Sequence, residues 1–277
     1  MFLHSEQWKN FQERAGRTTR SFKGGGYAVR MALPAGLHYW YSPFATGVED
    51  LIALGKETGA VFVKCEPMST EGSLAQQLIR KGFVIATKAL QPQCTRIVAL
   101  GGEEAMLAGM RPKTRYNIRV AQKRGVTVAR EESLAEFIAL MEETTQRDKF
   151  HAHPARYYGE LVKTEGVSLY VARTGGAPAA SAIVLADGRM GIYLHGASSY
   201  AHRTDMAPFA LHWEIMKELA SNGVSEYDLW GIDEKKWPGV TRFKAGFGGR
   251  EVSYIGSYDY VLRAMWYTAY QVKNRLR

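Results

Sequence analysis

The sequence predicts an α/β fold with two successive domains of the same kind. Helical and strand-like hydrophobic patterns alternate along all 277 residues. A similar order of elements starts again after Pro92. Hydrophobic residues make up 46% of the chain, which is enough to build two cores. We therefore expect a first domain over residues 1–92, completed by the C-terminal segment 255–277, and a second domain over residues 93–254.

In the first half, short apolar runs alternate with amphipathic stretches. Pro34 to Gly36 predicts a bend between two strands, and Gly82 predicts the end of a helix. We expect helices over 6–15, 48–58 and 73–81, and strands over 27–33, 37–41, 60–65 and 83–87. The segment 261–277 has one apolar stripe and a basic end. We expect it to pack on the first half rather than touch lipid headgroups, because one stripe is typical of a docked helix.

The second half contains more strands and longer helices. We expect strands over 95–100, 126–129, 168–173, 179–186, 190–197 and 226–230. We expect helices over 103–109, 112–124, 133–147, 156–164 and 206–222. The segment from Thr241 to Gly249 fits two structures equally well: a strand followed by a glycine turn, or a loop whose glycines let the backbone approach a ligand.

Composition restricts the environment and the partners. The chain carries 36 Lys plus Arg against 27 Asp plus Glu, a formal net charge of +9 that suits a phosphate-rich partner or an anionic membrane. It lacks an apolar run of membrane-spanning length and an N-terminal signal peptide, so we expect a cytoplasmic protein, with at most peripheral contact at the inner membrane face. The spacings of Cys65 and Cys94, and of His151 and His153, predict neither a disulfide nor a metal site.

The most informative segment is the predicted basic helix that follows Pro112. Residues 111–125 carry six Lys or Arg and no acid. Four cations recur every four residues and would lie along one side of a helix. A solvated helix face is the ordinary explanation, but such faces usually mix charges of both signs. We therefore expect a polyanion or phosphate site that includes Lys113, Arg115, Arg119 and Lys123.

Four segments, in the same order, resemble the FemABX family of aminoacyl-tRNA-dependent transferases that build the interpeptide bridge of peptidoglycan. They are Ser5-Glu-Gln-Trp8, Pro112-Lys-Thr-Arg-Tyr-Asn-Ile-Arg119, Gly196-Ala-Ser-Ser-Tyr200 up to Pro208, and Asp228-Leu-Trp-Gly-Ile-Asp233 up to Lys244. The resemblance implies two tandem GNAT-like (acetyltransferase-like) domains. No heptad pair long enough for the family's coiled-coil arm occurs, so we expect the armless form. A coenzyme A loop would want Gln or Arg where Phe243 stands.

The resemblance implies a donor, an acceptor and catalytic residues. Aminoacyl-tRNA would be the co-substrate, without another cofactor, and lipid II or a nucleotide-linked UDP-MurNAc-peptide the acceptor. Lys244 would stabilise the oxyanion, Phe243 would shape the pocket, and Arg242 would contact phosphate; alternatively, Lys244 only contacts a tRNA phosphate. The other open functions are a GNAT-like acyltransferase with another acyl donor and a non-catalytic basic RNA-binding module. We expect a monomer or a weak oligomer.

The resemblance also implies substrate-binding residues. Arg147 would grip the precursor phosphates, although a cation at a helix C-terminus explains it equally well. A second phosphate-binding lysine is replaced by Asn10, with Lys9 adjacent. Glu66 would lie near the stem peptide, or pair with Lys64 at a strand end.

Two further positions complete the expected site. Asp228 and Asp233 flank a strand end, where site residues of α/β sheets gather. Of the two, we expect Asp233 to belong to the site. Tyr200 belongs to a family segment and is expected at the substrate, as a residue of undefined role, like His195.

Overall fold

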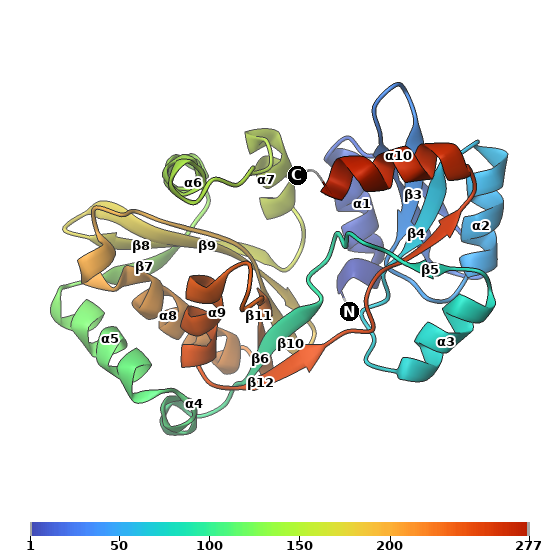
Figure 1. Cartoon of the computed structure of the whole chain (residues 1–277). Helices are drawn as coiled ribbons and strands as arrows, with labels where there is room; N and C mark the ends of the chain where they lie inside the picture. Colours follow the sequence, from blue (N-terminus) through green and yellow to red (C-terminus); the bar gives the residue numbers. More distant parts are fainter. Residues whose placement is uncertain (1, 276–277) are drawn as a thin grey trace. The chain divides into compact units, whose positions relative to one another are not determined.

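The computed structural model describes residues 2–275, which form two compact units (Figure 1). Unit 1 comprises the chain up to Gln93 and from Ser253 onward, and unit 2 comprises Cys94–Val252. Residues 1, 276 and 277, which belong to the first expected domain, lie outside the described residues.

Unit 1 is built on a six-stranded sheet of order β1-β2-β3-β4-β13-β5. Strand β13 lies antiparallel to both β4 and β5, so a C-terminal strand completes the N-terminal sheet. The elements are η1 (Phe2–His4), α1 (Glu6–Arg14), β1 (Thr19–Ser21), β2 (Tyr27–Ala32), β3 (His38–Ser42), α2 (Val48–Glu57), β4 (Phe62–Cys65), α3 (Gly72–Arg80), β5 (Val84–Ile85), β13 (Tyr258–Val261) and α10 (Ala264–Arg275).

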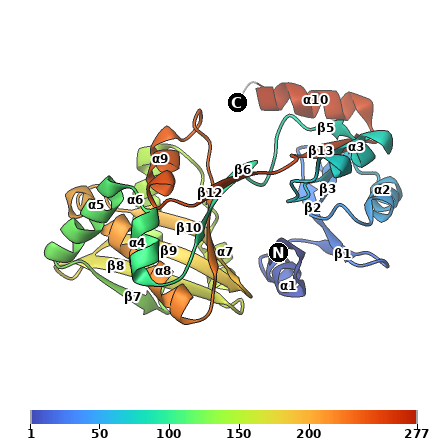
Figure 2. The same cartoon turned by 90° about the horizontal axis from the view of Figure 1, so that it is seen from below.

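Both faces of this sheet are covered because its strands are apolar on both sides. Trp40 and Val63 belong to the core that contains α2 and α3, whereas Tyr39 and Phe62 belong to the core on the other face. Helix α10 packs there through Tyr267 and other aromatic side chains, and it lies beside β13 (Figure 2). The expected packing of the C-terminal helix on the first half is therefore observed.

Unit 2 is built on a seven-stranded sheet of order β12-β6-β11-β10-β9-β8-β7. Strands β10 and β11 are parallel, and β7 to β10 form antiparallel neighbours. The elements are β6 (Cys94–Ala99), α4 (Glu103–Gly109), α5 (Pro112–Lys123), β7 (Thr127–Glu131), α6 (Ala135–Asp148), α7 (Ala155–Val162), β8 (Val167–Thr174), β9 (Ala177–Asp187), β10 (Met190–Ser198), η2 (Arg203–Asp205), α8 (Ala207–Ser221), β11 (Glu226–Gly231), α9 (Pro238–Gly246) and β12 (Arg250–Ser253).

Helices α6 and α8 cover opposite faces of this sheet (Figure 1). Helix α8 packs Leu211, Ile215 and Leu219 into the main core, and its charged residues are confined to one side. With 15 residues it is the longest helix of residues 2–275, so this part of the chain has no coiled-coil arm. The expected α/β fold with an armless second domain is confirmed.

Residues 241–246 are helical, so neither the expected strand nor the expected loop is observed there. Pro238 begins α9, where its fixed φ and missing N–H suit the first helical position, and the helix ends at Gly246. Strands β1, β12 and β13 were not predicted. Strands β1 and β12 lie at sheet edges and are largely exposed, so their sequences lack an apolar alternation.

Candidate functional site

The centre of the candidate site is a bulge in β11. Pairing between β11 and β6 shifts register between Asp228 and Gly231. Trp230 adopts φ 62°, a left-handed conformation that is costly for a bulky residue. The buried carboxylate of Asp228 accepts hydrogen bonds from the Trp230 N–H (2.7 Å) and the Thr95 hydroxyl, and thereby stabilises the bulge. Bulges of this kind are frequent beside active sites because they redirect the backbone.

Lys244 reaches this bulge from α9. Its Nζ donates a hydrogen bond to Gly231 O at 2.7 Å, and the lysine is only 6% exposed. The ammonium also lies 5.5 Å from the Tyr193 ring. Burial lowers the pKa of Lys244 to about 8, and the charge of Asp228 opposes this shift. Among residues 2–275, no carboxylate forms an ion pair with Lys244, so it is a desolvated cation with little charge compensation.

Phe243 lies beside Lys244 and joins an aromatic cluster. Its ring centroid is 5.0 Å from that of Phe209 and 5.5 Å from that of His212. His212 is buried and contacts the Tyr227 hydroxyl at 3.0 Å. Burial, followed by the charge of Lys244, lowers the pKa of His212 to about 3, so the imidazole is neutral at physiological pH. The cluster meets the Lys244 site through Tyr193, whose ring centroid lies 4.6 Å from that of His212.

The glycines after Lys244 pack against the chain itself. A Cβ on Gly246 would lie 2.3 Å from Thr114 Oγ1, and one on Gly248 would lie 2.2 Å from Gly109 O. The Arg111 N–H also donates to Gly246 O at 2.9 Å. The close approach that we expected toward a ligand is therefore made between the end of α9 and the start of α5. It couples the candidate catalytic helix directly to the basic helix.

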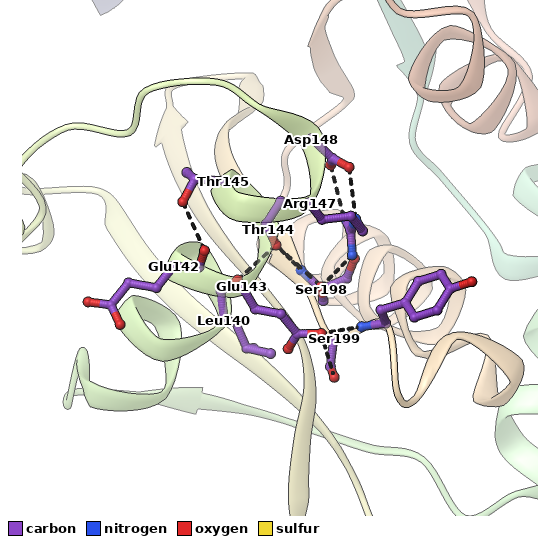
Figure 3. A network of polar contacts seen from close by, with 10 residues as sticks. Leu140, Glu142, Glu143, Thr144, Thr145, Arg147, Asp148, Ser198 and Ser199 are labelled. Carbon is purple, nitrogen blue, oxygen red and sulfur yellow. Dashed lines mark hydrogen bonds and ion pairs between the residues drawn. The ribbon is translucent and has the colours of Figure 1, made fainter.

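Arg147 ends α6 with its guanidinium already engaged (Figure 3). Nε and Nη2 donate to the two carboxylate oxygens of Asp148 at 2.8 and 2.9 Å, and Nη1 donates to Ser198 O at 3.0 Å. The hydrogen bonding of Arg147 to the Asp148 carboxylate is the main cause that raises the pKa of Arg147. A phosphate that binds to this planar fork must replace Asp148, because both ligands need the same edge.

A neighbouring carboxylate of α6, that of Glu143, positions Tyr200. The carboxylate of Glu143 accepts the Tyr200 N–H at 2.6 Å and the Ser199 hydroxyl at 3.2 Å. The Tyr200 ring is exposed, and the Arg203 guanidinium lies 4.2 Å from its centroid. The structure thus brings the segments of Arg147 and Tyr200 together. Glu143 was not predicted, because only the fold brings it to the end of β10.

Asp233 has a local structural role. Its Oδ1 accepts the N–H groups of Lys235 (3.0 Å) and Lys236 (2.9 Å), and these backbone bonds, that of Lys236 foremost, lower its pKa. It therefore shapes the turn before α9. Asp228, which the sequence ranked lower, is the carboxylate whose charge acts on Lys244.

The side chains of both expected substrate residues of unit 1, Lys9 and Glu66, already interact with neighbouring groups of the chain. Lys9 pairs with Glu6 at 2.9 Å. Glu66 is buried and accepts the backbone N–H groups of Leu90 (2.7 Å) and Gln91 (2.9 Å), while burial raises its pKa. The alternative ion pair of Glu66 with Lys64 is wrong, since Lys64 forms its salt bridge with Asp259 at 2.8 Å.

The basic helix presents fewer free cations than its spacing predicts. Lys113, Arg119 and Lys123 are exposed, and Arg242 is exposed on α9. Arg115 departs from the expected stripe, because it is half-buried and donates to the carbonyls of Leu107 (3.3 Å) and Met110. These carbonyls belong to the end of α4, where a cation is favoured.

The described residues contain neither a candidate metal-binding cluster nor a helix that could span a membrane. Residues 2–275 hold no group of three His, Cys, Asp or Glu side chains that could bind a metal ion. None of the described helices has the length and apolar character needed to cross a membrane.

Comparison with known proteins agrees with this geometry. The family profile of the acetyltransferase (GNAT) domain matches residues 108–245 of unit 2. The aminoacyltransferase FemB of Staphylococcus epidermidis is 28% identical over 123 residues, which cover 43% of this chain but only 28% of FemB. The lipid II:glycine glycyltransferase of Staphylococcus saprophyticus is 23% identical over 305 aligned residues, covering 80% of this chain and 74% of that protein.

The solved structure of FemX superposes on 97% of this chain and 94% of its own, with a TM-score of 0.79 at 18% identity, which shows that the fold is shared. The relatives and the shared fold support the FemABX family, and the profile and the fold show two tandem GNAT-like domains.

Proposed function

We propose that this chain is an aminoacyltransferase that moves an amino acid from aminoacyl-tRNA to the stem-peptide amine of a peptidoglycan precursor, either lipid II or its nucleotide-linked form. The observation that carries the proposal is the buried, largely uncompensated cation of Lys244 beside the β11 bulge. Strongly shifted groups of this kind concentrate at functional sites. The names of the relatives FemB and lipid II:glycine glycyltransferase support the choice of reaction.

The chemistry needs a cation where charge develops. The acceptor amine attacks the ester carbonyl, a C–N bond forms, and the carbonyl oxygen becomes an oxyanion. Collapse of this intermediate breaks the ester C–O bond; the amine loses a proton and the departing tRNA hydroxyl gains one. With one N–H bonded to Gly231 O, the ammonium of Lys244 has further N–H groups for the oxyanion. In a desolvated site such a donor stabilises the transition state more than it would in water.

The other candidate residues fit this reaction as substrate contacts. Phe243 would form the wall of the pocket beside the reacting ester. Arg147 would exchange Asp148 for a precursor phosphate. The exposed cations Lys113, Arg119, Lys123 and Arg242 would contact the tRNA backbone, and the close packing of Gly246 on Thr114 connects these helices. Glu143 would keep the Tyr200 segment in place.

A transfer assay with a radiolabelled amino acid tests the proposal. Charged tRNA is the donor, and lipid II or UDP-MurNAc-pentapeptide is the acceptor. Lys244→Met should lower the transfer rate by about a hundredfold or more, because it removes one preorganised donor. Lys235→Met, an exposed lysine of the preceding turn, is the matched control and should transfer normally.

The pH profile supplies an independent readout. The proposed role needs protonated Lys244, so kcat/KM should fall above the lysine pKa of about 8. Transfer from acyl-CoA instead of charged tRNA would support the other acyltransferase function. Tight RNA binding without transfer from any donor would support a binding module. Lys244→Met turnover within a few-fold of the unmodified protein would contradict the catalytic role.

A further inference from the structure

Exposed large apolar side chains are concentrated on one part of unit 1. Among residues 2–93 and 253–275, every such exposed side chain lies on α3, β5, the segment just after β5, or α10. Met265 is 79% exposed, Ile85 71% and Trp266 40%. We call this set the α10–β5 patch: Ile79, Val84, Ile85, Leu90, Met265, Trp266 and Val272.

The segments of the patch meet around one edge of the sheet, with α3 directly before β5 on one face and α10 on the other face. Strand β5 is the edge strand of the sheet and pairs with β13, which leads directly into α10. The Thr87 hydroxyl donates to the Gln271 side chain, which joins the segment after β5 to α10. Figure 2 shows α10 beside β13, and the Tyr267 hydroxyl of α10 donates to Asp259 of β13 at 2.9 Å. Helix α10 packs inward through Tyr267 and Tyr270, so Met265 and Val272 remain on its outer side.

The segments that carry the patch have charges of one sign. Residues 72–93 and 260–277 contain no Asp or Glu. Exposed basic residues accompany the apolar ones on the same segments: Arg80, Lys81, Lys88, Arg263 and Lys273. Only Lys81 of these has a carboxylate partner, Glu49, among the described residues. An apolar stripe with Trp and Met, flanked by Lys and Arg, is typical of a surface that lies in the interface of an anionic bilayer.

We propose that the α10–β5 patch binds unit 1 peripherally to an anionic phospholipid membrane. The apolar side chains would enter the headgroup region and the basic ones would meet lipid phosphates. A second copy of this chain is a poorer occupant, because a symmetric contact would bring two acid-free basic faces together. The proposal does not depend on the proposed transferase function, since membrane binding can be measured without either substrate.

Sedimentation of the full chain with vesicles tests the proposal. Vesicles of phosphatidylcholine with phosphatidylglycerol should bind the protein, and vesicles of phosphatidylcholine alone should bind it much more weakly. Met265→Ser/Trp266→Ser and, separately, Arg263→Glu/Lys273→Glu should each lower the partition coefficient by about tenfold or more. Raised salt should weaken binding of the unmodified chain.

Matched controls separate the patch from general effects. Phe150→Ser removes an exposed aromatic of unit 2, and Lys56→Glu/Lys163→Glu changes the net charge equally; both should bind like the unmodified protein. Circular dichroism checks that every variant is folded. Patch variants that bind as well as the controls would overturn the proposal. It would also be overturned by a chain that ignores anionic vesicles but forms a dimer, by light scattering, which the patch variants dissociate.

Discussion

Each unit buries one lysine, and the two lysines are treated very differently. In unit 1, Lys64 of β4 donates to Lys88 O at 2.8 Å and to Ser257 Oγ at 3.0 Å, and it pairs with Asp259 at 2.8 Å. In unit 2, Lys244 donates to Gly231 O and has no ion pair with a carboxylate among residues 2–275.

The difference separates a structural cation from a chemically available one. A buried ion pair with satisfied hydrogen bonds fixes the packing of the strands that carry it, here β4 and β13. A buried cation without such a partner is destabilised by desolvation in the free protein. It is stabilised when a negative charge develops beside it during the reaction. Burial alone therefore does not distinguish Lys244 as the candidate catalytic lysine, because Lys64 is buried too. The lack of an ion pair that compensates its charge does.

The largest expected effect comes from breaking the buried ion pair of Lys64 with Asp259. Lys64→Met leaves the buried carboxylate of Asp259 unpaired, so it should lower the free energy of unfolding by about 3–5 kcal/mol. Urea denaturation followed by circular dichroism measures this change. Lys81→Met, which breaks an exposed pair with Glu49, is the control and should cost less than about 1 kcal/mol. A similar small loss for Lys64→Met would remove the contrast.

The second prediction concerns the stability of the uncompensated site. Because the folded-state pKa of Lys244 is about 8, below the ordinary lysine value of 10.5, the unfolded chain binds more protons between these values. The free energy of unfolding should therefore gain a favourable contribution as pH rises from about 8 to 10.5, on the order of 3 kcal/mol in total.

Lys244→Met lacks this titration, so it should be more stable than the unmodified protein at neutral pH, with a gap that narrows toward pH 10.5. Urea denaturation of both proteins across this pH range measures the gap. Lys235→Met should leave the pH dependence unchanged. A constant difference between the two proteins would show that the charge of Lys244 costs nothing.

A third, smaller effect concerns Arg147, whose charge is compensated on the surface by Asp148. Asp148→Asn should free the guanidinium edge and tighten binding of UDP-MurNAc-pentapeptide several-fold, whereas Arg147→Ala should weaken it by about tenfold. Isothermal titration calorimetry measures both. Glu142→Gln removes a nearby exposed carboxylate of α6 and should have no effect. Equal affinities in all variants would show that this fork does not hold phosphate.

The smallest effect distinguishes free from engaged cations on α5. Arg119→Glu and Lys123→Glu should each weaken binding of aminoacyl-tRNA a few-fold and reduce its salt dependence, because both side chains are exposed. Arg115→Ala should instead lower the free energy of unfolding by about 1 kcal/mol, because it loses hydrogen bonds to the end of α4. Filter binding at several salt concentrations, with urea denaturation, checks both. An unchanged salt slope for the two Glu variants would contradict tRNA binding there.

Much of the fold could be predicted because most helices and inner strands carry a strong local period. The long β9 and the apolar α8 are examples, since burial on one or both faces dictates their residues. Strand β13 could not be assigned from its four residues, because its partners β4 and β5 lie far away in the sequence. Helix α9 was missed because its aromatic and glycine residues fit a strand and turn as well as a helix.

The sequence by itself determined the fold class, the family and the segment that carries Phe243 and Lys244, because these depend on residue order and spacing. The tertiary structure alone decided how charges are compensated. It brings Lys244 Nζ within hydrogen-bond distance of Gly231 O and pairs Lys64 with Asp259 rather than Glu66. It also directs the Arg115 guanidinium to carbonyls at the end of α4. The physical reason is that hydrogen bonding and desolvation depend on which distant groups share a buried site, and no local pattern encodes that neighbourhood.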